Sequence, residues 1–185
     1  MKLDEILNKL KQTLPEKRFT HTLAVCEVAV QLAERFGVDK DQAYLAALLH
    51  DCARGLNTEQ QLEYCRKHEI ELDDYMKSDI NPVHALIGAH MAEREFGVTD
   101  NDVLNAIHRH VVGCEDMTLL DKIIFVADGI ERNRTGNDAE NARAAAKNNL
   151  NEAVVIVATT IKSYYLQGKP MHPHSIRMVN KLSNL

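Results

Sequence analysis

The residues of this sequence that could do chemistry centre on histidine, which accounts for 9 of its 185 residues. Histidine serves both as a neutral metal ligand and as a proton carrier near neutral pH. One histidine, His50, is followed by Asp51 at the end of the very apolar segment AYLAALLHDCA. Burying both groups would cost several kcal/mol unless hydrogen bonds or a metal ion satisfied them. The doublet therefore predicts either a hydrogen-bonded core pair or part of a metal site.

Four further groups share this setting, because each is a polar side chain within or at the edge of an otherwise apolar helical face. They are His21, His84, His110 and Asp128. Each of them alone would commonly be a hydrogen-bonded core residue or a helix-end residue. Together with the doublet they make six groups directed inward from helices, which is how helical proteins build a metal site in their core. Imidazole and carboxylate ligands without a thiolate suit a site for iron, manganese or zinc. They are less typical of a structural zinc centre.

The segments that must position these groups are helices, because helix caps rather than strand turns recur along the chain. Few aromatic residues (5%), no tryptophan, 8 glycines and 4 prolines speak against an all-β fold. With 45% hydrophobic residues, the chain suits one all-α domain of roughly eight to ten helices. The expected helices span about 15–36, 39–55, 58–68, 81–96, 99–110 and 118–131, followed by an alanine-rich helix, a long apolar helix to about Leu166 and a short helix after Ser175. The expected N-caps are Asp39, Thr58, Asn81, Thr99 and Thr118, and the expected stops include Gly37 and Gly97.

The charge balance, with 22 Lys and Arg against 27 Asp and Glu, gives a net charge of −5. We therefore expect no binding to nucleic acid or to an anionic membrane, and an anionic substrate would need a local basic pocket. The four cysteines form no CxxC pair and are expected to be reduced. The N-terminal segment MKLDEILNKLKQTL lacks a continuous apolar stretch, and no later run reaches about 18 apolar residues. These features predict a soluble, cytoplasmic protein.

The order of the six groups, an early histidine, a His-Asp doublet, two further histidines and a late aspartate, resembles the HD-domain metal-dependent phosphohydrolases. The two intervening histidines are typical of their two-metal branch. The local sequences resemble the YqeK family of bacterial HD proteins, which hydrolyses diadenosine tetraphosphate symmetrically to two ADP. These sequences are RFTHTLAV, ALLHDCARGL, PVHALIGA, AIHRHVVG, MTLLDKIIFVADGIERNR and GKPMHPHS, and the resemblance runs from about Leu3 to Leu182. The departures from the family pattern are Arg54, His108, Gly129 and Arg132.

This resemblance implies a single HD domain, a helical bundle over residues 1–185. Its metal-binding core would lie at about 18–130, and helices at 138–183 would complete the bundle and the pocket. The implied cofactor is a pair of divalent or mixed-valence metal ions, with iron favoured and manganese, cobalt or zinc also compatible. The implied ligands, joined by Asp51 as a bridge, are His21, His50 and Asp128 for one metal and His84 and His110 for the other.

The mechanism that the resemblance implies is attack of a metal-bridging hydroxide on a phosphorus atom, which expels ADP in line. The implied activity is that of a symmetrical bis(5'-nucleosyl)-tetraphosphatase. Asp51 and Asp128 would be the catalytic residues, with Asp128 or a neighbouring histidine orienting the water.

Basic residues are expected to bind the substrate, a dinucleoside polyphosphate, around the metals. Arg18 and Arg54 each lie three positions from an expected ligand and thus on the same helix face, and Arg134 follows the last ligand in a loop. Arg18 could equally be a solvated residue at a helix start, and a solvated position is the less favoured reading for Arg54. His110 and His172 complete the expected substrate-binding residues.

The remaining histidines divide into two groups. His108 is expected to point outward or to lie at the pocket edge. By sequence alone His172 and His174 favour the surface, although their family-like setting indicates a loop that touches nucleotide. His68 and His90 lie among charged neighbours and are expected to be exposed.

Three alternatives stay open on the sequence. The first is another two-metal HD phosphohydrolase that acts on nucleotides or cyclic dinucleotides, because the ligand set fixes the chemistry and not the leaving group. The second is a non-catalytic nucleotide-binding helical domain that keeps a metal for stability. The third is a helical interaction domain whose histidine content is accidental. Exposed helix faces would also allow a homodimer.

Overall fold

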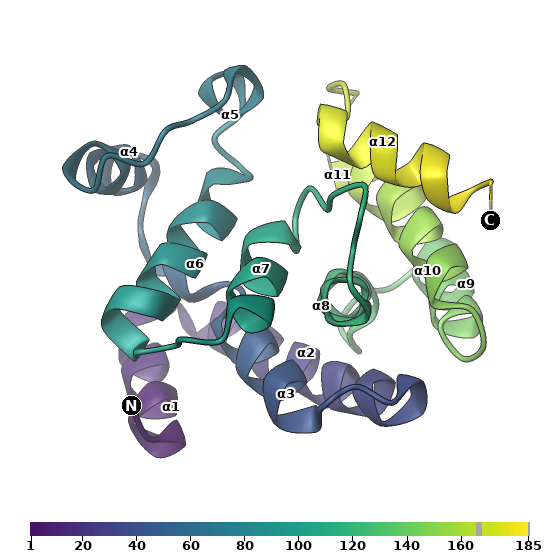
Figure 1. The fold of residues 1–185 in the computed structure, drawn as a ribbon, viewed down its shortest axis with the longest axis horizontal. Helices are drawn as coiled ribbons and strands as arrows, with labels where there is room; N and C mark the ends of the chain where they lie inside the picture. Colours follow the sequence, from purple (N-terminus) through teal and green to yellow (C-terminus); the bar gives the residue numbers. More distant parts are fainter. Residues whose placement is uncertain (166–167, 185) are drawn as a thin grey trace.

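The computed structural model describes residues 1–165 and 168–184, and every regular element in these ranges is helical (Figure 1). The all-α prediction is thereby confirmed. A π-helical segment divides one continuous helix into α10 and α11, and residues 74–78 form the short helix α5. The predicted end of the long apolar helix at Leu166 lies outside the described residues. The helices are α1 (Leu3–Thr13), α2 (Glu16–Phe36), α3 (Lys40–Leu49), α4 (Thr58–Lys67), α5 (Asp74–Ser78), α6 (Val83–Phe96), α7 (Asn101–Arg109), α8 (Leu119–Ile130), α9 (Asn137–Ala145), α10 (Leu150–Ile156), α11 (Lys162–Tyr165) and α12 (Pro173–Leu182), with a 3₁₀ turn at Cys52–Gly55 and the π-helical segment at Val157–Ile161.

Capping side chains and glycines fix the ends of the helices that carry the candidate site. Asp39 accepts hydrogen bonds from two amides in the first turn of α3, and Thr118 caps α8, both as predicted. Gly37 and Gly97 end α2 and α6 with φ angles of 71° and 74°, which a residue with a Cβ atom rarely adopts.

Three predicted helix starts are displaced by one residue and a fourth by more. In two of these cases a neighbouring Asn or Asp, whose side chain caps at least as well as threonine, accepts the first-turn amide instead. The observed starts are Asn57 rather than Thr58 as the cap of α4, Pro82 rather than Asn81 before α6, Asp100 rather than Thr99 as the cap of α7, and Pro173 rather than a residue after Ser175 for α12.

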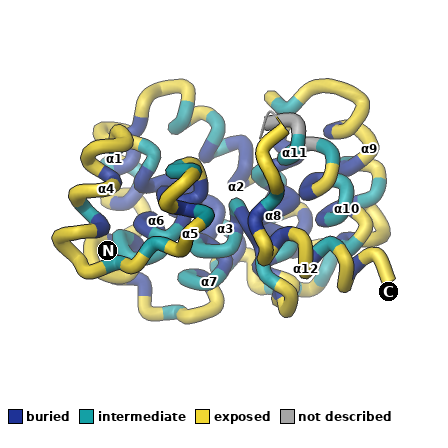
Figure 2. The backbone as a smooth tube through the Cα atoms, turned by 90° about the horizontal axis from the view of Figure 1, so that it is seen from above, coloured by how far each residue is buried: buried dark blue, intermediate teal, exposed yellow. Residues whose placement is uncertain are grey.

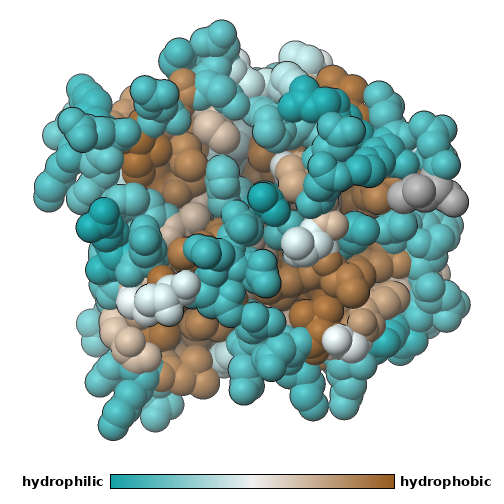
Figure 3. Space-filling view, in the orientation of Figure 1, coloured by the Kyte–Doolittle hydropathy of each residue, from teal (hydrophilic) through white to brown (hydrophobic). Residues whose placement is uncertain are grey.

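One hydrophobic core runs from α1 to α12 and makes the chain a single domain. Helix α8 lies at its centre, seen end-on in Figure 1, and α2, α3 and α7 pack on one side of it while α9 and α10 pack on the other. Figure 2 shows the buried backbone along α8 and its neighbours, with exposed residues at the rim. On the face of Figure 1 hydrophilic side chains cover most of the surface, and hydrophobic ones gather in smaller areas between them (Figure 3). Among the described residues no helix combines the length and the apolar character needed to cross a membrane.

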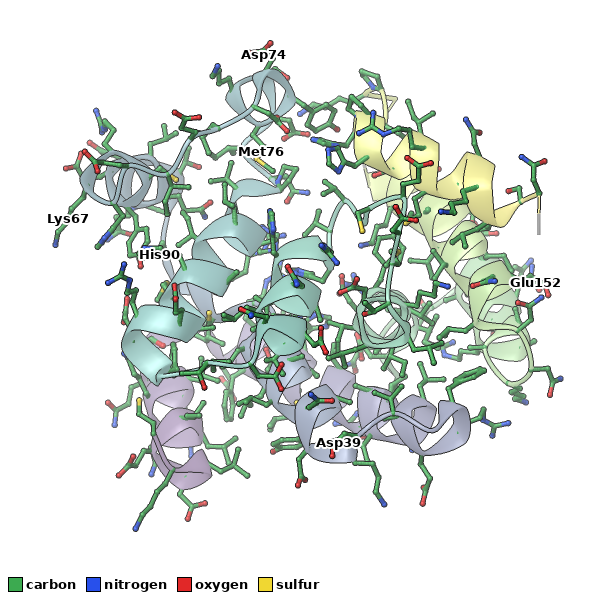
Figure 4. The ribbon with its side chains drawn as sticks, viewed as in Figure 1. Asp39, Lys67, Asp74, Met76, His90 and Glu152 are labelled. Carbon is green, nitrogen blue, oxygen red and sulfur yellow. The ribbon has the colours of Figure 1, made fainter. Side chains whose placement is uncertain are left out.

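A smaller cluster of buried residues connects α4 and α5 to the start of α6. Met76 of α5, labelled in Figure 4, packs in it with Val83 and Ile87 of α6 and Cys65 of α4. The short helix α5 is therefore anchored beside the N-terminus of α6.

The π-helical segment between α10 and α11 lies against α8. The hydroxyls of Thr159 and Thr160 donate to the carbonyls of the residues four positions earlier, at 2.6 and 2.5 Å. Such single π-helical turns occur frequently at functional sites. This one is followed directly by Lys162, the first residue of α11.

Candidate metal centre and basic pocket

Six polar residues from five helices converge on one point of the core, as the sequence predicts. His21 lies in the second turn of α2, whereas the others lie at or near helix ends or on α8. The five others are His50 and Asp51 after α3, His84 in the first turn of α6, His110 after α7 and Asp128 in α8.

The carboxylate of Asp51 lies between two pairs of histidines. Its Oδ2 atom is 3.9 Å from Nε2 of His21 and 3.6 Å from Nε2 of His50. Its Oδ1 atom is 3.2 Å from Nε2 of His84 and 3.7 Å from Nε2 of His110. Each pair forms with Asp51 a group whose donor atoms lie within 4.8 Å of one another. These two groups share one carboxylate, which is the geometry of a bridging ligand.

The backbone aims three of the four imidazoles. His50, His84 and His110 each donate from Nδ1 to the carbonyl of the residue three positions earlier, so their Nε2 atoms face the cluster. The carbonyls of Ala47 and Ile107 are free to accept because they lie in the last turns of α3 and α7, whereas Asn81 precedes α6. The Nδ1 to oxygen distances are 2.6 Å for His50 to Ala47, 2.5 Å for His84 to Asn81 and 2.7 Å for His110 to Ile107.

Asp128 contacts the cluster through His21, whose Nε2 atom is 3.3 Å from Asp128 Oδ1. The same oxygen accepts from Arg134 Nη2 at 2.8 Å, and Lys162 Nζ lies 4.0 Å from the other oxygen. Asp128 therefore lies beside the two close groups around Asp51, at the junction of the cluster with basic side chains.

The electrostatics of the cluster favour neutral imidazoles at His84 and His110 beside a charged Asp51. The pKa of His21 is raised instead, because its burial is outweighed by Asp128 and Asp51. Burial, aided by the neighbouring histidines, holds the pKa of His110 well below its usual value, and burial also lowers the pKa of His84. Burial raises the pKa of Asp51, but His50, His84 and Arg54 outweigh it and hold that pKa well below its usual range. Neutral imidazole and ionised carboxylate are the forms that bind metal ions.

A cavity of about 450 Å³ opens beside the cluster and is lined by Asp51, His84, His110 and Asp128. Its other charged lining residues are mostly cationic: Arg18, Arg54, Arg134, Lys162 and Lys169. The structure therefore brings the three arginines that the sequence suggested to one pocket. An acidic chain thus carries a local basic pocket of the size that small ligands occupy.

Two arginines, Arg18 and Arg54, contact the carboxylate of Asp51. Arg18 Nη1 lies 3.1 Å from Asp51 Oδ2, although 41% of the Arg18 side chain is exposed. Arg54 Nε lies 3.5 Å from Asp51 Oδ1. Both cations can thus contact a ligand in the cavity while they stay next to Asp51.

Lys162 is a basic residue of the site that the sequence did not reveal. Its ammonium donates to the carbonyls of His110 and Val111 and lies 3.7 Å from the centre of the Phe125 ring. Burial lowers its pKa to about 8, although Asp128 acts in the opposite direction. No motif signals Lys162, because its contacts join residues about fifty positions apart.

A second feature, which we call the pocket strap, connects residues 73–79 with residues 169–172 across the cavity. His172 Nε2 lies 2.8 Å from Asp73 Oδ2, and Tyr75 donates to the carbonyl of Pro170 at 3.0 Å. The Lys169 ammonium lies 3.4 Å from a carboxylate oxygen of Asp79. Side chains of both segments line the cavity, so the strap forms one of its walls.

The histidines outside the cluster correct two expectations. His172 is only 5% exposed, contrary to a surface position, because it packs against Asp73 in the strap. His90 is half-buried rather than exposed and bonds the Tyr64 hydroxyl at 2.9 Å between α4 and α6 (Figure 4). His68 and His174 are exposed. His108 is half-buried and does not belong to the described lining of the cavity.

Comparisons with known proteins agree with this geometry. The HD domain family matches residues 18–133. The symmetrical bis(5'-nucleosyl)-tetraphosphatase of Bacillus subtilis is 36% identical over 98% of both chains, and that of Halalkalibacterium halodurans is 34% identical over 98% of this chain and 97% of its own. A crystal structure from Clostridium acetobutylicum, described as a predicted HD superfamily hydrolase involved in NAD metabolism, superposes with a TM-score of 0.92 at 37% identity and covers 100% of this chain and 98% of its own.

Proposed function

The chain belongs to the HD domain family, and from this premise we propose that it hydrolyses diadenosine tetraphosphate symmetrically to two ADP in a metal-dependent reaction. The observation that carries this proposal is the Asp51 carboxylate, whose two oxygens face separate histidine pairs beside a basic pocket. The names of the relatives that match almost the whole chain supply the substrate.

The donor atoms of the cluster suit a pair of divalent cations. The Nε2 atoms of His21 and His50 are buried and lack a hydrogen-bond partner among the described residues, which is costly unless a cation satisfies them. One ion would be held by His21, His50 and Asp51, and the other by Asp51, His84 and His110. Asp128 would lie next to the ion at His21. A set of imidazole and carboxylate donors suits iron, which we propose, and also admits manganese, cobalt or zinc.

The chain's own residues would divide the work of the reaction. When bound, the metal pair would lower the pKa of a coordinated water and neutralise charge on phosphate oxygens. Arg18, Arg54 and Lys162 would bind the polyphosphate from three sides and set its direction relative to Asp51. The Asp128 carboxylate would accept a hydrogen bond from the attacking water and thus orient it.

Product analysis tests this function directly. Purified protein loaded with iron or manganese should convert diadenosine tetraphosphate to ADP alone, resolved by anion-exchange chromatography. Release of AMP with ATP would exclude symmetrical cleavage. Phosphate release from mononucleotides or opening of cyclic dinucleotides, without ADP from diadenosine tetraphosphate, would indicate a different HD phosphohydrolase.

A further inference from the structure

One of the four clustered histidines is held differently from the rest. His21 lies within α2, where the carbonyls of the preceding turn already accept helical hydrogen bonds, so its Nδ1 atom cannot use the backbone as the other three do. Instead Nδ1 faces Oε1 of Glu131 at 3.3 Å. Among the described contacts of the four Nδ1 atoms, that of His21 is made with a charged side chain, whereas the other three are made with backbone carbonyls.

Glu131 itself is fixed firmly at the end of α8. It is only 2% exposed, and its second oxygen, Oε2, accepts from the backbone amide and the side-chain amide of Asn133 at 2.7 and 2.9 Å. Arg143 donates to the Glu131 carbonyl at 2.7 Å and holds the backbone there. With Oε2 held by these donors, the buried carboxylate directs Oε1 at His21, and Arg134 Nε lies 3.9 Å from the same oxygen.

We infer that Glu131 is a positioning residue which keeps the proton of His21 on Nδ1 and makes Nε2 a stronger metal donor than the other three imidazoles. A carboxylate behind a ligating histidine fixes its tautomer and raises its basicity, whereas a backbone carbonyl carries no charge. The two groups that share Asp51 are therefore unequal, and the group with His21 and His50 binds a divalent cation more tightly. This inference rests on the metal centre of the proposed function and not on its substrate.

The test measures metal affinity on the full-length chain. Metal-free protein is equilibrated with buffered Mn²⁺, and bound manganese is counted by mass spectrometry across a range of free concentrations. Wild type should fill in two separate steps, and Glu131→Gln should weaken the tighter step about 10- to 100-fold while the weaker step stays unchanged. His84→Ala should instead remove the weaker step, which assigns the steps to the two groups.

Two further variants separate positioning from loss of structure. Glu27→Gln makes the same chemical change at an exposed carboxylate of α2, which pairs with Arg132, the residue next to Glu131. This control should leave both steps unchanged. Asn133→Ala removes one of the two donors to Oε2 and should weaken the tighter step by a few fold, without the risk of altering a buried residue. The nitrogen-15 spectrum of the His21 ring should show the proton on Nδ1 in wild type and its redistribution in Glu131→Gln.

Several outcomes would overturn the inference. Two equal steps in wild type would contradict inequality of the groups, and an unaltered tighter step in Glu131→Gln would contradict the role of Glu131. Equal weakening of both steps would show a structural role alone. If wild type retained no metal, this inference and the proposed metal centre would both fail. If the protein bound metal normally but did not cleave diadenosine tetraphosphate, the proposed substrate would fail and the inference about Glu131 would stand.

Discussion

Asp73 and His172 stand 99 positions apart in the sequence, yet Nε2 of His172 lies 2.8 Å from Oδ2 of Asp73. Their contact ties the segment before α6 to the segment before α12, and residues of both segments line the cavity. The pocket wall at this place depends on a pairing between distant parts of the chain and not on a single continuous loop.

The first prediction concerns this pairing. His172→Gln should raise KM for diadenosine tetraphosphate about fivefold, which corresponds to the roughly 1 kcal/mol of one hydrogen bond, because the strap loosens. The value of kcat and the metal content should change little, since the residue does not touch the cluster. Steady-state kinetics with His174→Gln, an exposed neighbour, as the control would measure this. An unchanged KM would show that the strap does not shape the substrate site.

The second prediction concerns the bridging position. Asp51→Asn should lower kcat/KM by more than about 100-fold and reduce bound metal together, because one side chain belongs to both groups and outer contacts alone cost 10- to 100-fold. Kinetics and metal analysis on the same preparation check it. Asp138→Asn, at an exposed position of α9, is the control. Retained substrate binding and metal with lost turnover would instead place Asp51 outside the metal centre.

The third prediction concerns Lys162. Lys162→Met should raise KM for the tetraphosphate about 10- to 100-fold, because a charge-assisted hydrogen bond to a phosphate contributes roughly 1.5–3 kcal/mol. Metal content should stay at the wild-type level. Lys181→Met, an exposed lysine of α12, removes the same charge outside the pocket and should leave KM unchanged. Equal effects of both variants would mean that the net charge, and not this pocket cation, matters.

The fourth prediction is a dependence of stability on pH at the cap of α7, the helix that leads to His110. A hydrogen bond from Gln42 and two from first-turn amides lower the pKa of Asp100 below its ordinary value of 3.8. A lowered pKa stabilises the fold at pH values above 3.8, and this contribution is lost as the pH falls through the pKa of the folded state. Asp100→Ala should therefore cost about 1–2 kcal/mol at pH 7, as loss of a cap does, and clearly less at pH 3.

Urea unfolding of this variant at both pH values provides the measurement. Asp102→Ala, at an exposed position in the same helical turn, should show a smaller loss of stability at pH 7 and serves as the control. A cost that stayed constant between pH 7 and pH 3 would contradict the ionised cap.

The fifth prediction concerns the close approach of α8 to the π-helical segment. A Cβ atom at Gly129 would lie 2.6 Å from a methyl group of Val157, so Gly129→Ala should destabilise the protein by about 1–3 kcal/mol. The double variant with Val157→Ala should recover part of this loss. In Gly88→Ala the new atom meets ordinary contacts of 3.5 Å or more, so this matched change should be neutral or stabilising. Thermal unfolding of wild type, Gly129→Ala, the double variant and Gly88→Ala measures these differences.

The helices and the histidine cluster were predictable because both follow from local rules. The helical spacing of apolar residues in α2 and α6 placed His21 and His84 on inward faces. His110 was expected at the end of a helix, and His50 at the end of an apolar run inside the expected helix 39–55. Some starts such as Asp100 were wrong by one residue, because two adjacent residues can both cap and only the folded backbone selects one of them. The end of the expected helix 39–55 was also wrong, since α3 ends at Leu49 and a 3₁₀ turn covers Cys52–Gly55.

The pocket was less predictable because its contacts are not local. Lys162 lies in the stretch TIKSYY near the end of the expected long helix, and nothing in that stretch indicates that it reaches the carbonyl of His110. His172 becomes buried only because Asp73 meets it across the cavity. Glu131 follows the apolar residues of α8 as an ordinary acidic helix end would, and its role depends on His21 lying opposite to it.

The π-helical segment gives the pocket a dependence on chain length. A π-helical turn absorbs one more residue than an α-helical turn, so regular α-helical winding of all five residues of Val157–Ile161 would rotate the following residues by roughly 90°. Lys162 would then turn away from Phe125 and the end of α7, although its identity would be unchanged. Loss of one residue together with the π-helical turn would instead keep Lys162 in place, so homologues that conserve the lysine share its function only where the number of residues and the winding of this segment change together.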